Sequence, residues 1–455
     1  MFGVTKYNSD FHETTITLDS NYNELFSSSE LGQHTNSTPV SNYQTDSSVA
    51  YKNDDGTTSL YVYSAPVNFL RNSQYVMIDT RIKNIQDDAF KQNGFVYTVS
   101  NNDIIPYYPE KLSASSGVRL SKDFYYDFGL NTSKAIPAKY TEKSNFIGDQ
   151  KKMITYSNAA GNGIDVNFYP SSLGTNCEIS FSKKPKTNAV SFWLRLSDPN
   201  LAISKEPGGY LVIYTTGAAT RVDGAPEKNI VAVIQPPLLK DANNTIFYDN
   251  SVDCSKVSDG NYSIDFTFDD KGLSKNSTAY ISWEMRVEKE PDTALYSGKP
   301  SLQYAYLINR TIIGNSTDYG IGEQLIRFRF CNPFNLKSAN IVQANFYMYD
   351  VSRLDKNHPK QTYQLNSVLD DWCSVLGNWN KHYKIGEQTS ECNDDGEILS
   401  FDITNEVKKW CDDTTGQMEH NGVLLKASDE NTANYDVILS NDNALYRNRT
   451  EVILK

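Results

Sequence analysis

The stretch AVSFWLRL, from Ala189 to Leu196, decides the fold class, because polar and apolar residues alternate along it. Side chains of a β-strand point alternately to opposite faces, so a period of two predicts a strand. The turn cluster NDDG (Asn53–Gly56) and others like it punctuate the chain at the spacing of antiparallel strands. The sequence therefore predicts an all-β chain. The same alternation recurs in SLYVYSAPVNF (Ser59–Phe69), IDVNFY (Ile164–Tyr169), CEISFS (Cys177–Ser182), YLVIY (Tyr210–Tyr214), YSIDFTF (Tyr262–Phe268) and AYISWEMRV (Ala279–Val287).

The length of 455 residues predicts more than one domain. The segment EKEPDTALYSGKPS interrupts the alternation near residue 295 with two prolines and a glycine. We expect an N-terminal extension or edge strand over residues 1–48, a β-sandwich over 49–294 and a second antiparallel sandwich over 295–455. No fixed-period repeat is visible.

Helix signals are few, and they lie in the C-terminal part. In FDITNEVKKWC (Phe401–Cys411), Thr404 is a candidate N-cap, and Val407, Trp410 and Cys411 fall on one helical face. A second candidate helix runs from Ser367 to Leu376. We therefore expect one or two short helices packed on the C-terminal sandwich.

Charge and hydropathy limit the partners of the chain. The net charge is −12 and the pI is about 5.0, with no basic patch, so a phosphate backbone would be repelled and nucleic acid is not expected. No stretch approaches 18 uninterrupted apolar residues, and MFGVTKYNSD is not a signal peptide. We expect the chain to be part of a longer secreted or cell-surface polypeptide whose signal peptide lies outside it.

The cysteines give no metal-binding or redox motif. They stand at 177, 254, 331, 373, 392 and 411 without any CxxC spacing, so zinc ribbons and thioredoxin-type motifs have no support. A division near residue 295 leaves two cysteines in one part and four in the other. Disulfides within each part and buried free thiols both remain possible.

These features together carry a resemblance. From about Leu302 to its end, the chain resembles the DNRLRE domain, a jelly-roll module of secreted and wall-associated bacterial proteins. The matching segments are LIRFRF (Leu325–Phe330), SANIVQANFYMYDV (Ser338–Val351), FDITNEVKKW (Phe401–Trp410) and NGVLLKAS (Asn421–Ser428). The upstream segments resemble the β-rich region that precedes this domain in wall-associated and Rhs-type proteins; they are YSAPVNFLRNSQYVMIDTRI (Tyr63–Ile82), ITYSNAAGNGIDVNFYP (Ile154–Pro170), GTNCEISF and QPPLLKDANNT (Gln235–Thr245). The resemblance implies an extracellular or surface location, a jelly-roll C-terminal domain and no catalysis.

Catalytic and metal motifs are weak. The 5 histidines lie in polar, loop-like surroundings, so candidate bases are few and no catalytic residue is predicted. Glu391, Asn393, Asp395 and Asp402 follow an imperfect EF-hand spacing, but the residues after Gly396 alternate as a strand. We therefore expect a hairpin turn there, no metal site and no cofactor.

Aromatic residues carry the binding hypothesis, because sugar rings stack on exposed indole and phenol rings while amides bind the hydroxyls. Trp193, Trp283 and Trp410 lie in periodic segments and are predicted to be core residues. Trp379, in the polar loop GNWNKHYK, is the best candidate for an exposed platform. A loop Trp that covers one end of a sandwich is the competing interpretation. The predicted ligand-binding residues are Trp379, Tyr383, Asn378 and Asn380.

Two functions follow from these observations. The first is a non-catalytic surface module that binds a polysaccharide or cell-wall glycan, or that serves as a structural segment of a longer secreted protein. The second is a β-sandwich carbohydrate-active enzyme, a lyase or a hydrolase. The small number of histidines and the lack of a catalytic motif favour the first.

Overall fold

The structure is a computed structural model that describes most of the chain. It comprises residues 39–63, 66–121, 125–144, 150–184, 188–205, 209–220, 226–234, 237–241, 246–247, 250–268, 279–287, 293–298, 310–317, 319–327, 334, 336–350, 352, 358–370, 379–393, 398–412, 421–439 and 448–455.

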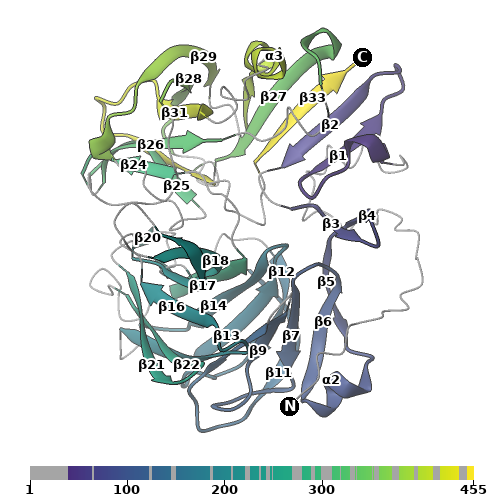
Figure 1. The fold of residues 1–455 in the computed structure, drawn as a ribbon. Coiled ribbons are helices and arrows are strands. Elements are labelled where there is room, and N and C mark those ends of the chain that lie inside the picture. The colour runs from purple at the N-terminus through teal and green to yellow at the C-terminus, as the bar shows by residue number, and fades with distance from the viewer. Residues whose placement is uncertain are drawn as a thin grey trace.

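Strands dominate these residues, and the predicted all-β class is confirmed (Figure 1). Sheet I has the order β21 (Ser251–Ser258), β22 (Asn261–Thr267), β15 (Ala189–Leu196), β10 (Tyr125–Leu130), β9 (Val118–Ser121), β7 (Ile105–Pro109), β6 (Phe95–Asn101) and β5 (Asp79–Asn84). Sheet II has the order β16 (Leu201–Lys205), β17 (Leu211–Thr220), β18 (Pro226–Ile234), β23 (Ala279–Val287), β14 (Gly174–Phe181), β13 (Ile164–Pro170), β12 (Gln150–Tyr156), β11 (Ile136–Ser144) and β8 (Lys111–Leu112). Beside β23 lie β19 (Leu238–Asp241) and β20 (Ile246–Phe247), which pair with each other.

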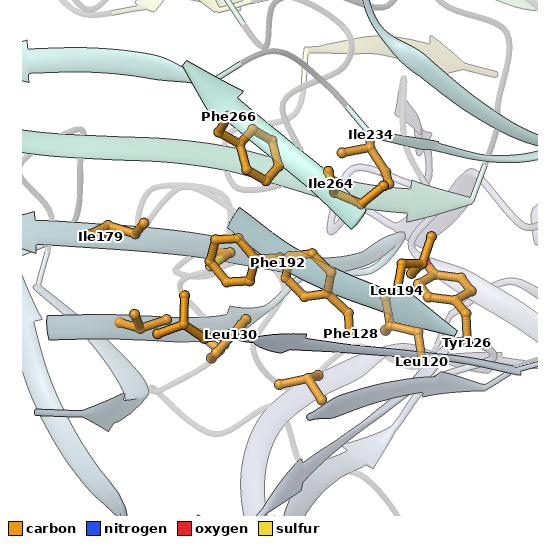
Figure 2. Packing of buried hydrophobic residues seen from close by; sticks show 14 of the residues in the cluster. Leu120, Tyr126, Phe128, Leu130, Ile179, Phe192, Leu194, Ile234, Ile264 and Phe266 are labelled. Carbon is orange, nitrogen blue, oxygen red and sulfur yellow. The ribbon is translucent and has the colours of Figure 1, made fainter. Parts of the chain in front are cut away.

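Sheets I and II share one core. Alternate residues of β15, Phe192 and Leu194, point inward and meet Ile179 of β14 in the same apolar cluster (Figure 2). The rings of Phe128 and Phe192 stack with centroids 4.6 Å apart, and Phe266 meets Phe192 edge-on at 5.8 Å. Burial of one face of each sheet is what the alternation in the sequence predicts.

A second pair of sheets forms the rest of the fold. Sheet III has the order β1 (Ser48–Lys52), β2 (Thr58–Tyr63), β33 (Arg449–Leu454), β27 (Ile341–Tyr349) and β30 (Ile398–Asp402). Sheet IV has the order β29 (Ile385–Asn393), β28 (Thr362–Val368), β31 (Val423–Ala427), β26 (Gly320–Ile326), β25 (Arg310–Ser316) and β32 (Tyr435–Leu439), and β24 (Thr293–Tyr296) also pairs with β26. Short elements complete the described chain: the hairpin β3 (Asn68–Arg71) and β4 (Gln74–Met77), helices α2 (Asp88–Gln92) and α3 (Thr404–Asp412), and the 3₁₀ turns η1 (Ser41–Tyr43), η2 (Ser338–Asn340) and η5 (Trp379–Lys381).

Sheets III and IV enclose the second core, and α3 closes one side of it. Val407 and Trp410 of this helix are buried against Phe346 and Phe401 of sheet III. The helix predicted in Phe401–Cys411 is therefore confirmed, as is the core position of Trp410. Thr404 begins the helix, but Asp402 binds its first amide, with the Thr404 N–H donating to Asp402 Oδ1 at 2.9 Å.

The second predicted helix, Ser367–Leu376, is wrong at its start. Ser367 belongs to β28, where it pairs with Val423 of β31. The cross-strand partners on both sides of β28 favour extended backbone over the local helical pattern. Residues 371–378 lie outside the described part of the chain.

The β1–β2 hairpin turns through Asn53–Gly56, as predicted, with Gly56 at a φ of 86°. The sequence did not indicate which sheet this hairpin joins. β2 pairs antiparallel with β33 along its whole length, so residues 48–63 complete sheet III rather than the sheets of the following segment. The strand pairing thus differs from the expected start of the first sandwich at residue 49, and the division near residue 295 stays a prediction.

The loop with the imperfect EF-hand spacing connects two strands. β29 precedes it in sheet IV and β30 follows it in sheet III, so these two strands do not pair with each other as the predicted hairpin would require. Residues 394–397 lie outside the described part of the chain. Asp402, at the last position of the EF-hand spacing, binds the start of α3.

Candidate functional site

Trp379 and Tyr383 lie on the outer face of sheet IV, on and just after η5. Both side chains are half-buried against an apolar cluster that contains Leu325, Val368 and Leu424. The structure thus brings the two predicted aromatic residues together on one surface. Their side chains are less exposed than those of a free aromatic platform and more exposed than those of core residues. Asn380 is exposed beside them, and Asn378 lies outside the described residues.

Strand register explains why this surface faces away from the core. Leu425 of β31 points into the core shared with sheet III, so its neighbours Leu424 and Lys426 point outward. Leu424 pairs with Asn366 of β28, and Lys426 pairs with Gln364. Two adjacent rows therefore cross the outer face, one apolar at Leu424 and one polar at Lys426.

The polar row continues across the sheet in both directions. Glu391 of β29 pairs with Gln364 and accepts a hydrogen bond of 3.0 Å from Gln388 Nε2. On the other side, Gln324 pairs with Leu425, which places Glu323 across from Lys426. The row thus offers amide, ammonium and carboxylate groups at the spacing of neighbouring strands, about 4.8 Å.

A carboxyl pair ends this row. The carboxyl groups of Glu323 and Glu430 lie within hydrogen-bonding reach of each other, so either one can donate to the other when it is protonated. Burial and the nearby Glu430 carboxyl raise the pKa of Glu323 to about 7, and burial raises the pKa of Glu430 as well. Lys426 opposes both shifts, because its ammonium group favours the ionised carboxylates.

The carboxyl pair is too close for glycoside hydrolysis. Retaining glycosidases hold their carboxyl groups about 5–5.5 Å apart and inverting enzymes hold them farther apart, so that a sugar or a water fits between them. Two hydrogen-bonded carboxyls leave no such room. This pair can share a proton and bind hydroxyl groups, but it does not have the geometry of a glycosidase.

A second polar group ties the two sheets of this core together. Tyr363 of β28 contacts two fully buried carboxylates, Asp436 of β32 and Asp350 at the end of β27, the latter at 3.1 Å. His358, one of the few candidate bases, lies with its Nε2 atom 2.6 Å from Asp436 Oδ1. Gln361 donates to Asp436 Oδ2 at 3.1 Å. Because these residues come from both sheets, the group fixes one end of the sandwich.

Sheet I carries a second aromatic surface that was not predicted from the sequence. Trp193 was expected in the core, but the buried residues of β15 are Phe192, Leu194 and Leu196, and Trp193 is partly exposed on the opposite face. The signal was present in AVSFWLRL, where Ser191, Trp193 and Arg195 share the second parity. A strict period of two assigns this Trp to the polar face. The side chain of Trp283 lies outside the described residues.

Cys177 and Cys254, the two cysteines upstream of residue 295, carry free thiols. Burial raises the pKa of the Cys177 thiol well above its ordinary value. Among the described residues, no three His, Cys, Asp or Glu side chains gather as a metal site would require. In the same residues, no helix has the length and apolar character needed to cross a membrane.

Comparison with known proteins adds little. No protein-family model matches the chain, and no curated protein matches it. Among solved structures, the N-terminal domain of an adhesin from Streptococcus gordonii aligns over 78% of this chain and 88% of that one, with 6% identity and a TM-score of 0.16. A TM-score this low carries no argument about fold or function.

Proposed function

We propose that this chain is a non-catalytic β-sandwich module that binds a polysaccharide, such as a cell-wall glycan, on the outer face of sheet IV. The observation that carries the proposal is the placement of Trp379 and Tyr383 on one half-exposed surface. Beside it runs the polar row formed by Gln364, Lys426 and Glu391. Aromatic faces bind the C–H surfaces of sugars, and a polar row binds their hydroxyls.

The proposal includes a place for the module in a secreted or surface protein, and membership of the DNRLRE family, whose segments the chain resembles. The alternative of a lyase or hydrolase is the weaker one, because the carboxyl pair on this face, Glu323 and Glu430, is too close for glycoside hydrolysis. A purely structural segment would show no glycan binding.

A glycan array followed by polysaccharide retention tests the proposal, with the wild type and Trp379→Ala compared side by side. Stacked aromatic anchors contribute on the order of 1–3 kcal/mol, so we expect the substitution to lower affinity by about tenfold or more. Tyr75→Ala, which removes an exposed ring from the β3–β4 hairpin, is the control and should leave binding unchanged.

The melting temperature of the same variants separates binding from structure. A large fall in melting temperature for Trp379→Ala would assign the ring a structural role as the cover of its apolar cluster. Trp379→Phe then becomes the second variant, since it keeps an aromatic ring on the cluster and should retain part of the binding. Retention that is unchanged in Trp379→Ala, with an unchanged melting temperature, would remove this surface from any glycan site.

A further inference from the structure

The outer face of sheet I carries an ordered row of polar side chains. Strand pairing aligns Arg119 of β9, Asp127 of β10, Arg195 of β15 and Asn261 of β22. The next row holds Gly129, Trp193 and Ser263 in the same strand order. These positions alternate with the core residues of the same strands, so they all lie on the face opposite the core.

Trp193 is held in place on this face. A Cβ atom added to Gly129 would come within 2.5 Å of the indole, so the ring lies directly over this glycine of β10. The indole Nε1–H donates to the carbonyl oxygen of Ser113 at 3.1 Å. The ring is thus fixed at two points and remains partly exposed.

Arg195 is exposed and its guanidinium lies over this ring, with the guanidinium carbon 5.3 Å from the ring centroid. Its neighbour in the register, Asp127, is occupied by Arg119, which donates two hydrogen bonds of 2.6 and 2.9 Å to it. Arg195 itself donates only a long bond of 3.4 Å to Asn261 Oδ1. Within the described part of the chain, no carboxylate lies at ion-pair distance from Arg195.

The acidic groups on this face do not neutralise Arg195. Asp265 accepts hydrogen bonds from Ser191 at 2.6 Å and from Ser263 at 3.3 Å. It lies four residues along β22 from Asn261, a separation of about 13 Å at the rise of a strand. Asp127 is consumed by its two bonds to Arg119, so the local charge at Arg195 remains positive.

We infer that Trp193 and Arg195 form a second carbohydrate site, on sheet I, that takes an acidic sugar residue. The sugar packs at the exposed edge of the indole, its carboxylate or sulfate binds the N–H edge of the guanidinium, and the Ser263 hydroxyl oxygen accepts a hydrogen bond from a sugar hydroxyl. A guanidinium held beside an aromatic ring keeps its planar donors ready for an anion. One cation among amide and hydroxyl groups suits a sugar with one acid group among several hydroxyls.

Titration with three polymers tests this site in the full chain: oligogalacturonate as the carboxylate probe, dextran sulfate as the sulfate probe and dextran as the neutral probe. We expect at least one acidic probe to bind about tenfold or more tighter than dextran, with an affinity that falls as salt rises. Whichever acidic probe binds identifies the acid group.

Variants assign the binding to the residues. Arg195→Gln should bring the acidic probe to the affinity of dextran, and Arg195→Lys should recover only part of the loss because it lacks the planar donors. Arg81→Gln, which removes an arginine paired with Asp79 on β5, is the matched control and should change nothing. Trp193→Ala tests the contribution of the indole. If this variant has a lowered melting temperature, Trp193→Phe, which keeps an aromatic ring, replaces it.

Several outcomes would overturn the inference: equal affinity for acidic and neutral probes, no binding of any acidic probe at millimolar concentration, or no effect of Arg195→Gln. Polyglutamate that binds as tightly as the acidic glycan, with the same sensitivity to Arg195→Gln, would replace a glycan with an acidic peptide. The inference shares only the ligand class with the proposed function. Loss of binding in Trp379→Ala alone upholds the sheet IV site, and loss in Arg195→Gln alone upholds the sheet I site.

Discussion

Glu323 provides a pH-sensitive group on the outer face of sheet IV. Its pKa is about 7 in the folded chain against an ordinary value of 4.5, so between these values the folded state holds a proton that the unfolded state has released. Stability should therefore fall as pH rises from about 4.5 to about 7, and level off above.

Glu323→Gln mimics the protonated acid and should flatten this part of the profile, as measured by chemical denaturation between pH 4 and 8. Glu387→Gln, at an exposed position of β29, is the control and should keep the wild-type slope. A calcium-dependent gain in stability that Glu430→Gln abolishes would mean that a metal, and not a proton, joins the two carboxyls.

Tyr363 stabilises the core through its hydroxyl, which contacts both Asp436 and Asp350. Tyr363→Phe leaves these buried carboxylates without that donor and should cost about 1–3 kcal/mol in the free energy of unfolding. Urea denaturation measures the cost. Tyr125→Phe, at a partly exposed side chain, should cost far less, and equal losses in the two variants would show that the buried hydroxyl has no special role.

Among the elements, α3 depends on Asp402, two residues before its start. Asp402 Oδ1 accepts from both the backbone N–H and the hydroxyl of Thr404, at 2.9 and 2.6 Å. Asp402→Ala removes this acceptor and should cost about 0.5–2 kcal/mol, while Asp402→Asn keeps an acceptor oxygen and should cost less. Thermal denaturation of the two variants compares them, and an equal loss would show that charge, not the acceptor, stabilises the helix.

The sequence predicts where several strands lie but not which strands pair. Alternation located the strands around Ile164, Cys177, Ala189 and Tyr262, because local burial on one face leaves a period of two. The alternation also indicates that Trp193 lies on the polar face of its strand. The prediction of a core position for Trp193 followed the general tendency of Trp to be buried instead. The pattern does not encode strand partners, so it could not place Glu323 across from Lys426 or Trp379 against the cluster that contains Leu424; those contacts arise from register between distant segments.

At the scale of the whole molecule, β2 joins sheet III although most of the chain separates it from β33. Leu60 of β2 is fully buried in the core between sheets III and IV. Leu60→Ala should therefore cost about 2–5 kcal/mol. Hydrogen exchange should show lost protection in β33 and β27 but not in β15 or β22.

Leu70→Ala, at an exposed position in β3, is the control for this substitution and should change protection little. Loss of protection in β15 upon Leu60→Ala would instead mean that the two cores unfold as one unit. The result thus bears on the predicted division of the chain near residue 295.

The pairing of β2 with β33 also determines when sheet III can form during translation. β33 lies between β2 and β27, so sheet III cannot close until residues 449–454 have left the ribosome. At about 5–20 residues per second, the β1–β2 hairpin waits roughly 20 to 80 s for its neighbour, with Leu60 and Val62 lacking the sheet that buries them. The nascent chain therefore carries an open strand edge while sheets I and II emerge and fold.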